Sequence, residues 1–198
     1  MNKKLKQMKP NLFKTWIISA LLMTSFMAIG QNRSYFEVDG GYTVIGNNAQ
    51  SGYGINVNAG YTIFNIVTPS LGYQFHSLSS QSNHYNSDAK LDIAYFAIKV
   101  NALNFKWFSF NLGPVVFRRI WKQDYNVKDG YILHKDGLTM NQDHTYSYYK
   151  PNFGYGGVAG VKFDLYKGIG VKLDATYQID FDHKDSMLFT SGGVFFRF

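Results

Sequence analysis

One histidine stands directly before a serine in the sequence, at His76 and Ser77. An imidazole beside a hydroxyl combines the base and the nucleophile of acyl-transfer chemistry. The residues around this pair alternate as in a β-strand, where neighbouring side chains point to opposite faces. A proton relay between the two is therefore unfavourable. We expect no catalytic residues and no enzymatic activity, and a lipid-modifying enzyme is kept only as an alternative.

The five histidines are the other candidates for chemistry, because imidazole and carboxylate groups are ligands for zinc, nickel or copper. Acidic residues stand beside His144 and His183, but no two histidines have an HxH or HxxxH spacing. The sequence therefore predicts no metal site and no cofactor, and it leaves metal capture by surface histidines open. The full set is His76, His84, His134, His144 and His183.

The elements of the chain can be predicted from the alternation of apolar and polar residues, which is clearest in the segment after residue 168. From Ile169 to Phe181, apolar residues occupy every second position, and polar or charged residues lie between them. A period of two indicates a β-strand with one apolar and one polar face. Seven further segments alternate in the same way. The predicted strands are residues 34–45, 53–64, 67–78, 89–102, 107–122, 152–165, 169–181 and 187–198.

These segments are long enough to cross a bilayer as tilted strands, and an even strand number is what a single-chain membrane barrel requires. The connections between them alternate in length. Short ones are residues 65–66, 103–106 and 167–168, and mostly longer ones are residues 46–52, 79–88, 123–151 and 182–186. Barrels with short periplasmic turns and longer outer loops show this asymmetry. The sequence predicts an all-β fold, a closed eight-stranded antiparallel up-and-down transmembrane barrel.

The first 30 residues have a different character. A lysine-rich stretch without acidic residues precedes an apolar run from Trp16 to Ile29, and Ala28 and Gly30 are the small residues of a cleavage site. We expect residues 1–30 to be a cleaved signal peptide and residues 31–198 to be the barrel domain, exported to the outer membrane. The formal net charge of +7 is concentrated in this leader. No nucleic-acid partner is therefore predicted.

The chain has no cysteine, which excludes disulfides and the cysteine-linked lipid anchor of a lipoprotein. Its last strand places Val194, Phe196 and Phe198 on one face. With the leader, the eight amphipathic strands and the sorted connections, this ending resembles the small OmpA/OmpX-type outer-membrane barrels over nearly the whole mature chain. The resemblance implies that these three residues form the signal read by the barrel-insertion machinery. It also implies outer-membrane lipids and lipopolysaccharide as partners.

Charged residues also occur on the polar faces of the predicted strands. In an eight-stranded barrel they point into a lumen only wide enough for side chains. Because each buried ion costs several kcal/mol to desolvate, these charges must pair. We predict a paired cluster in the periplasmic half, with Arg119 and Asp180 nearer the outer mouth; a structural plug is favoured over a gate. The ten members are Glu37, Asp39, Lys99, Arg119, Lys162, Asp164, Lys172, Asp174, Asp180 and Arg197.

The connection from Gln123 to Pro151 is the longest and contains a hairpin pattern around Asp136 and Gly137. A ribbon edge and exposed aromatic residues can recruit a partner, so this loop is the predicted site for an extracellular ligand. The candidate contact residues are Tyr131, His134, His144, Tyr146, Tyr148 and Tyr149. Arg118 and Lys122 are expected near the outer headgroups, where they can pair with lipid phosphates.

The expected role is structural. We predict an integral outer-membrane barrel that maintains the envelope or interacts at the cell surface through its outer loops. A narrow pore for small solutes or ions is the alternative.

Overall fold

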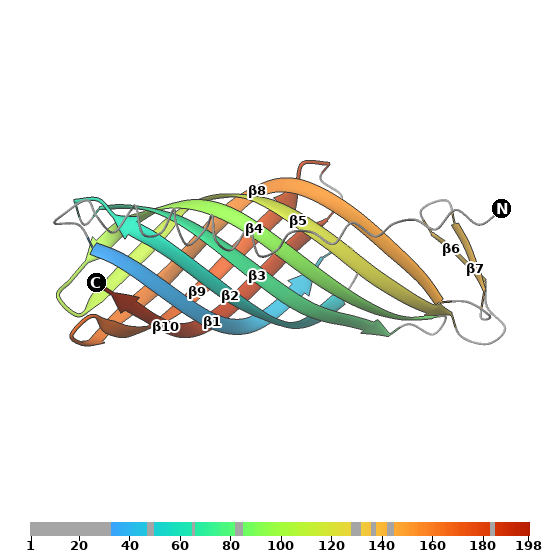
Figure 1. Cartoon of the computed structure of the whole chain (residues 1–198), viewed down its shortest axis with the longest axis horizontal. Helices are drawn as coiled ribbons and strands as arrows, with labels where there is room; N and C mark the ends of the chain where they lie inside the picture. The colour runs from blue at the N-terminus through green and yellow to red at the C-terminus, as the bar shows by residue number, and fades with distance from the viewer. Residues whose placement is uncertain are drawn as a thin grey trace, which may run out of the picture.

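The computed structural model describes residues 33–46, 50–64, 66–81, 85–127, 132–135, 138–141, 145–182 and 185–198. Eight strands form one closed antiparallel barrel in the order β1-β10-β9-β8-β5-β4-β3-β2 (Figure 1). Their bounds are β1 (Arg33–Ile45), β2 (Gln50–Thr62), β3 (Val67–Gln81), β4 (Tyr85–Asn104), β5 (Phe108–Val127), β8 (Thr145–Tyr166), β9 (Ile169–Asp180) and β10 (Ser186–Arg197). A separate hairpin joins β6 (Ile132–Lys135) to β7 (Leu138–Asn141). The predicted closed eight-stranded antiparallel barrel is confirmed.

The first and last strands of the barrel close it, as the pairing of Phe36 with Phe196 illustrates. No helix within the described ranges is long and apolar enough to cross a membrane. The predicted signal peptide, residues 1–30, lies outside the described residues, and its cleavage stays a prediction.

Burial in β9 is inverted relative to a water-soluble sheet. Leu173 is 59% exposed, whereas Lys172 is 1% exposed. The outward residues of the barrel are mostly apolar, and the inward residues include every charged side chain of β9. Because an exposed apolar surface of this extent is unfavourable in water, this arrangement fits an acyl-chain environment.

Aromatic residues gather at both ends of the outward apolar surface. The end of the barrel where β1 begins and β10 finishes is here the turn end, and the opposite end is the loop end. At the turn end the rings of Trp107 and Phe163 stack with centroids 6.2 Å apart. Near the loop end, Tyr42 meets Tyr53 edge-on at 5.6 Å. Aromatic girdles of this kind mark the two interfaces of membrane barrels.

The turns at the turn end are short, as predicted. β8 and β9 are joined by Lys167 and Gly168, which have φ values of +38° and +84°. Two consecutive positive φ values give a two-residue hairpin turn whose twist matches that of the strands. Glycine is needed at the second position, because a left-handed backbone there strains any residue with a Cβ.

Three strands exceed their predicted length by four residues or more, namely β4 and β5 with 20 residues each and β8 with 22 residues. They continue past the ends of β1 and β2 (Figure 1). We call the loop-end parts of four strands the wall: residues 77–81 of β3, 85–92 of β4, 118–127 of β5 and 145–153 of β8. The prediction of loops at residues 79–88 and 123–151 is therefore wrong for most of these residues, which belong to strands. The outward apolar pattern ends there because the polarity of the faces reverses: in β4, Asp88 and Lys90 are exposed and Ala89 between them is buried, although strand pairing continues.

Candidate functional site

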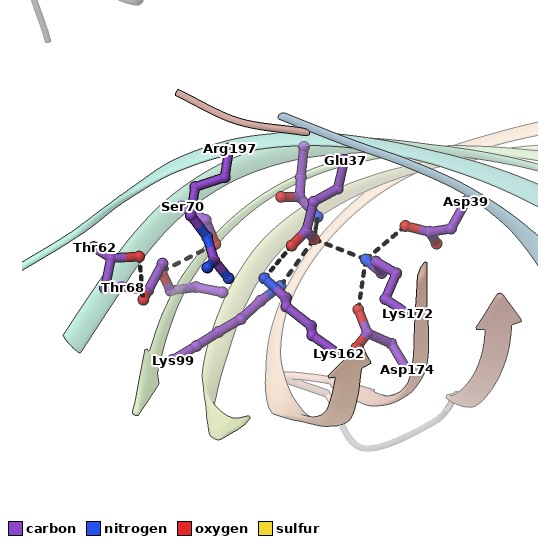
Figure 2. Close-up of polar contacts among 12 residues, drawn as sticks. Glu37, Asp39, Thr62, Thr68, Ser70, Lys99, Lys162, Lys172, Asp174 and Arg197 are labelled. Carbon is purple, nitrogen blue, oxygen red and sulfur yellow. Dashed lines mark hydrogen bonds and ion pairs between the residues drawn. The ribbon is translucent and has the colours of Figure 1, made fainter. Parts of the chain in front are cut away.

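Six charged side chains from four strands meet in the turn-end half of the lumen (Figure 2). They come from β1, β4, β8 and β9, so the group reaches across the lumen from one side of the barrel to the other. Three are acids and three are bases, which gives no net formal charge. We call this group the lysine–carboxylate cluster, and its members are Glu37, Asp39, Lys99, Lys162, Lys172 and Asp174.

Glu37 is the acceptor that holds the cluster together. Its Oε2 lies 2.8 Å from Lys172 Nζ and 3.5 Å from Lys99 Nζ. Its Oε1 forms an ion pair with Lys162, and Asn58 Nδ2 donates to Oε2 at 2.8 Å. Among the described residues, Glu37 is the carboxylate that pairs with both Lys99 and Lys162. Removing it would leave two buried ammonium groups without an ion-pair partner.

Lys172 is the corresponding donor. Its Nζ lies 2.7 Å from Asp39 Oδ2 and 2.6 Å from Asp174 Oδ2, in addition to its contact with Glu37. Figure 2 shows the ammonium group pointing between the three carboxylates. These carboxylates are close enough together to hold a metal ion. Lys172 already supplies the positive charge at their centre, so their arrangement needs no metal to explain it.

Two further ion pairs lie on either side of the lysine–carboxylate cluster. Arg197 and Asp164 pair at the turn end, with Nη1 3.2 Å from Oδ1. Near them, Lys162 Nζ lies 4.2 Å from the ring centroid of Tyr35. A small polar cavity of about 40 Å³ opens beside these residues. It is large enough to hold ordered water.

The second pair, Arg119 with Asp180, lies near the loop end and is fully buried. Asn152 Nδ2 donates to Asp180 at 2.7 Å. The Arg119 guanidinium also lies 5.2 Å from the ring centroid of Trp121. In the turn after β9, burial raises the pKa of the Asp185 carboxyl; the charge of Arg119 lowers this pKa, and that of Asp180 raises it. Arg119 therefore provides positive charge for two neighbouring carboxyl groups.

All ten residues of the predicted interior set lie in ion pairs, in three groups: the lysine–carboxylate cluster, the Arg197–Asp164 pair, and the Arg119–Asp180 pair nearer the loop end. Between the lysine–carboxylate cluster and Arg119 lies a group of buried apolar side chains, here called the apolar layer, that the sequence analysis missed; the buried, hydrogen-bonded polar residues Gln74 and Gln178 lie beside it. The apolar layer contains Leu91, Ile93, Phe117 and Phe189, all buried. Around Phe117 and Phe189, outward neighbours such as Val116 and Leu188 are apolar as well, so alternation did not distinguish the two faces there. The high proportion of apolar residues in these stretches of sequence was the only feature that could have indicated inward apolar side chains.

His76 lies inside the barrel and is buried, which corrects its inclusion among the surface histidines that could capture metal. Its Nδ1 is 2.7 Å from Thr43 Oγ1 and its ring packs edge-on against Phe189 at 4.8 Å. β3 continues beyond the predicted end at residue 78, so this position falls within the barrel. Ser77 points outward and is exposed. The two side chains therefore lie on opposite faces, as the strand period requires.

The predicted insertion residues lie on the outward face of the last strand. Val194 and Phe196 are partly exposed there, and Phe198 is 70% exposed. The Phe198 N–H donates to the Ser34 carbonyl at 2.8 Å, which fixes the end of the chain against β1. These positions present an apolar surface at the turn end. Recognition by the insertion machinery stays a prediction.

The predicted loop contacts do not form one loop. Tyr146, Tyr148 and Tyr149 belong to β8, which corrects their placement, and Tyr149 is 59% exposed. His134 belongs to β6, where its backbone pairs with Thr139. Tyr131, His84, His144 and His183 lie outside the described residues.

A closed eight-stranded barrel, apolar outside and ion-paired inside, has the fold of the small outer-membrane β-barrels. Solved structures with this fold include Ail, the attachment invasion locus protein of Yersinia pestis, with a TM-score of 0.56 and 12% identity over 85% of this chain and 100% of that chain. The outer-membrane protein OprG from Pseudomonas aeruginosa gives a TM-score of 0.56 and 10% identity over 85% of this chain and 98% of that chain.

Ail has also been solved in complex with the heparin analogue sucrose octasulfate, and that structure gives a TM-score of 0.58 and 11% identity over 85% of this chain and 100% of that chain. No protein-family model matches the sequence, and no curated protein is similar to it in sequence. The similarity is therefore one of fold, and at that level the resemblance to small outer-membrane barrels is confirmed.

Proposed function

We propose that this protein is a non-enzymatic integral barrel of the outer membrane, with a closed lumen and a surface role for its wall. The outward apolar surface and its aromatic rims match a lipid bilayer. The strands β4, β5 and β8 then carry paired backbone beyond that bilayer. A rigid β-sheet extension of this kind is suited to contacts with molecules at the cell surface.

The filled interior is the observation that carries this proposal. Following the lumen from the turn end, the Arg197–Asp164 pair is followed by the lysine–carboxylate cluster, the apolar layer and the Arg119–Asp180 pair. Ions would have to cross both the buried ion pairs and the apolar layer. Such a lumen favours a structural plug over a channel, since an eight-stranded barrel has only enough room for its own side chains.

The absence of enzymatic activity rests on the geometry of the one candidate pair. His76 points into the lumen and is hydrogen-bonded to Thr43, whereas Ser77 faces outward. A general base must lie within hydrogen-bond reach of its nucleophile. The pair does not meet this requirement.

Conductance in planar lipid bilayers tests the closed lumen. We expect the purified, folded protein to insert without sustained single-channel steps, because buried ion pairs and packed side chains fill the lumen. The same preparation should fractionate with the outer membrane and show the gel-mobility shift of a folded barrel.

A narrow pore would give a different result. Sustained steps in the wild type that disappear in R119A or D180N, but persist in D182N, would contradict the closed lumen. Asp182 is a suitable control because it lies outside the barrel strands, near the loop end, and pairs with Lys150 there at 3.1 Å.

A further inference from the structure

Groups that can donate hydrogen bonds dominate the lining of the small cavity at the turn end of the lumen. This is the polar cavity of about 40 Å³ beside the Arg197–Asp164 pair, and we call it the turn-end cavity. Lys162 and Arg197 contribute cationic groups, and other residues contribute hydroxyls and amides, as Tyr35 and Asn101 illustrate. Among the described residues that line it there is no carboxylate. Such a lining suits an acceptor with negative charge.

The Tyr35 hydroxyl lacks an acceptor in the part of the chain that the structure describes. Tyr35 is 5% exposed, and Lys162 Nζ lies 4.2 Å from the centroid of its ring. Ser70, which the strand registers place in the same row, donates to the Ala97 carbonyl at 3.5 Å. A buried polar group without a partner is destabilising. An acceptor bound in the turn-end cavity would therefore satisfy the Tyr35 hydroxyl.

The charged side chains nearest the turn-end cavity include one more base than acid. Lys99 and Lys162 share the carboxylate of Glu37, and Arg197 pairs with Asp164. Three bases against two acids leave a formal charge of +1 at this end of the lumen. Charges in a poorly hydrated interior interact more strongly than charges in water. The turn end is therefore favourable for one negative charge.

The compensating negative charge lies deeper in the lumen. Asp39 and Asp174 share the ammonium group of Lys172, although Lys172 also contacts Glu37. Figure 2 shows Asp39 and Asp174 on one side of Glu37 and Arg197 on the other. The charged interior is thus neutral as a whole, but its positive end faces the turn-end cavity. A monovalent anion would neutralise that end.

We propose that the turn-end cavity binds a small monovalent inorganic anion of the halide class, such as chloride. Lys162 and Arg197 supply the positive charge, and the Tyr35 hydroxyl donates a hydrogen bond to the ion. A cavity of this size accepts an ion about as large as a water molecule and is too small for an organic anion. The ion enters from the turn end and stops at the lysine–carboxylate cluster, so binding needs no open channel. The inference goes beyond the proposed surface role and does not depend on it.

Urea-dependent unfolding of the folded protein in lipid vesicles tests the proposal, with sodium chloride compared with sodium gluconate at the same concentration. Gluconate is an organic anion that the cavity cannot hold. An anion that binds only the folded state stabilises it by mass action, so chloride at ten times its dissociation constant raises the folding equilibrium constant about elevenfold. The wild type should show a saturable rise of this kind as chloride replaces gluconate.

Two tyrosine variants separate the site from a general effect of salt. Y35F should lose most of the chloride response and be at least as stable as the wild type in gluconate, because the hydroxyl that it removes has no partner among the described residues. Y95F is the matched control, since Tyr95 is also buried but donates to Asn56 Oδ1 at 2.9 Å outside the cavity. It should lose stability equally in both salts and keep the full chloride response.

A charge variant gives a change in the opposite direction. D164N removes the carboxylate that pairs with Arg197, so the turn end becomes more positive and chloride should act at lower concentrations. Anomalous X-ray scattering from crystals grown in sodium bromide should place a bromide ion between Tyr35, Lys162 and Arg197. Equal unfolding of the wild type in chloride and gluconate would overturn the proposal and leave the cavity as a water site. An undiminished chloride response in Y35F, or bromide bound only elsewhere, would overturn it as well.

Discussion

Replacing Glu37 with alanine is expected to lower the free energy of unfolding by about 3–5 kcal/mol, since removing one partner of a buried ion pair leaves uncompensated charge. Glu37 is 0% exposed and pairs with Lys99, Lys162 and Lys172. Lys172 keeps two other carboxylates, but Lys99 and Lys162 would lose the ion-pair partner that the structure gives them. The loss of stability therefore comes from two buried ammonium groups that have no ion-pair partner in a lumen with little access to water.

Urea-dependent unfolding in lipid vesicles measures this effect, with gel mobility and tryptophan fluorescence as readouts. A triple variant, E37L/K99L/K162M, removes the stranded charges together with Glu37. It should recover most of the lost stability, because apolar replacements of a buried ionic group are often neutral or stabilising. A change below about 1 kcal/mol in E37A, the range of exposed ion pairs, would show that the cluster is hydrated and contributes little.

Replacing Arg119 with alanine is expected to have an effect of similar size, about 3–5 kcal/mol. The guanidinium is fully buried against Asp180 and lies over the ring of Trp121. Its loss leaves Asp180 with Asn152 as its polar side-chain partner among the contacts described. The cation–π contact with Trp121 is lost as well, so R119A should also change the tryptophan emission spectrum, whereas E37A should not.

The two substitutions should act independently. Asp174 and Asp180 belong to the same strand and lie six residues apart, which is about 20 Å along a strand. The apolar layer separates the two charge groups, and distant sites without shared partners usually add. The double variant E37A/R119A should therefore lose the sum of the two single effects. A loss well below that sum would indicate one continuous, cooperative ion-pair network instead of separate groups.

The alternation of the sequence was sufficient for the fold because it has one simple physical cause. In β9 every second residue faces lipid, so Lys172, Asp174 and Asp180 could be placed inside from their parity alone. The same argument was applied to the other charged residues of the interior set, which lie in ion pairs in the structure. Their partners could not be predicted, because pairing depends on which distant strands become neighbours. Lys172 and Glu37, for instance, are 135 positions apart and meet only when the barrel closes.

Two features gave no pattern to interpret. Phe117 and Phe189 are inward residues among outward apolar residues, so the strand looks apolar on both faces. In the wall the polarity of the two faces reverses: Asp88 and Lys90 are exposed, whereas Ala89 and Leu91 are buried, so the outward apolar pattern ends although the backbone pairs continue. Periodicity reports the difference between two environments. Where both faces of a strand carry apolar residues, the sequence shows no alternation.

Site-directed spin labelling tests the central claim, that the outward apolar face meets lipid, most directly. The chain has no cysteine, so single labels can be introduced at Leu173 and Tyr177, with Lys122 as the control. In vesicles, the labels at 173 and 177 should be relaxed by dissolved oxygen and hardly by a water-soluble nickel chelate, whereas the label at 122 should respond to the chelate. If the chelate reaches residues 173 and 177 in the folded protein, the face meets water and the account is wrong.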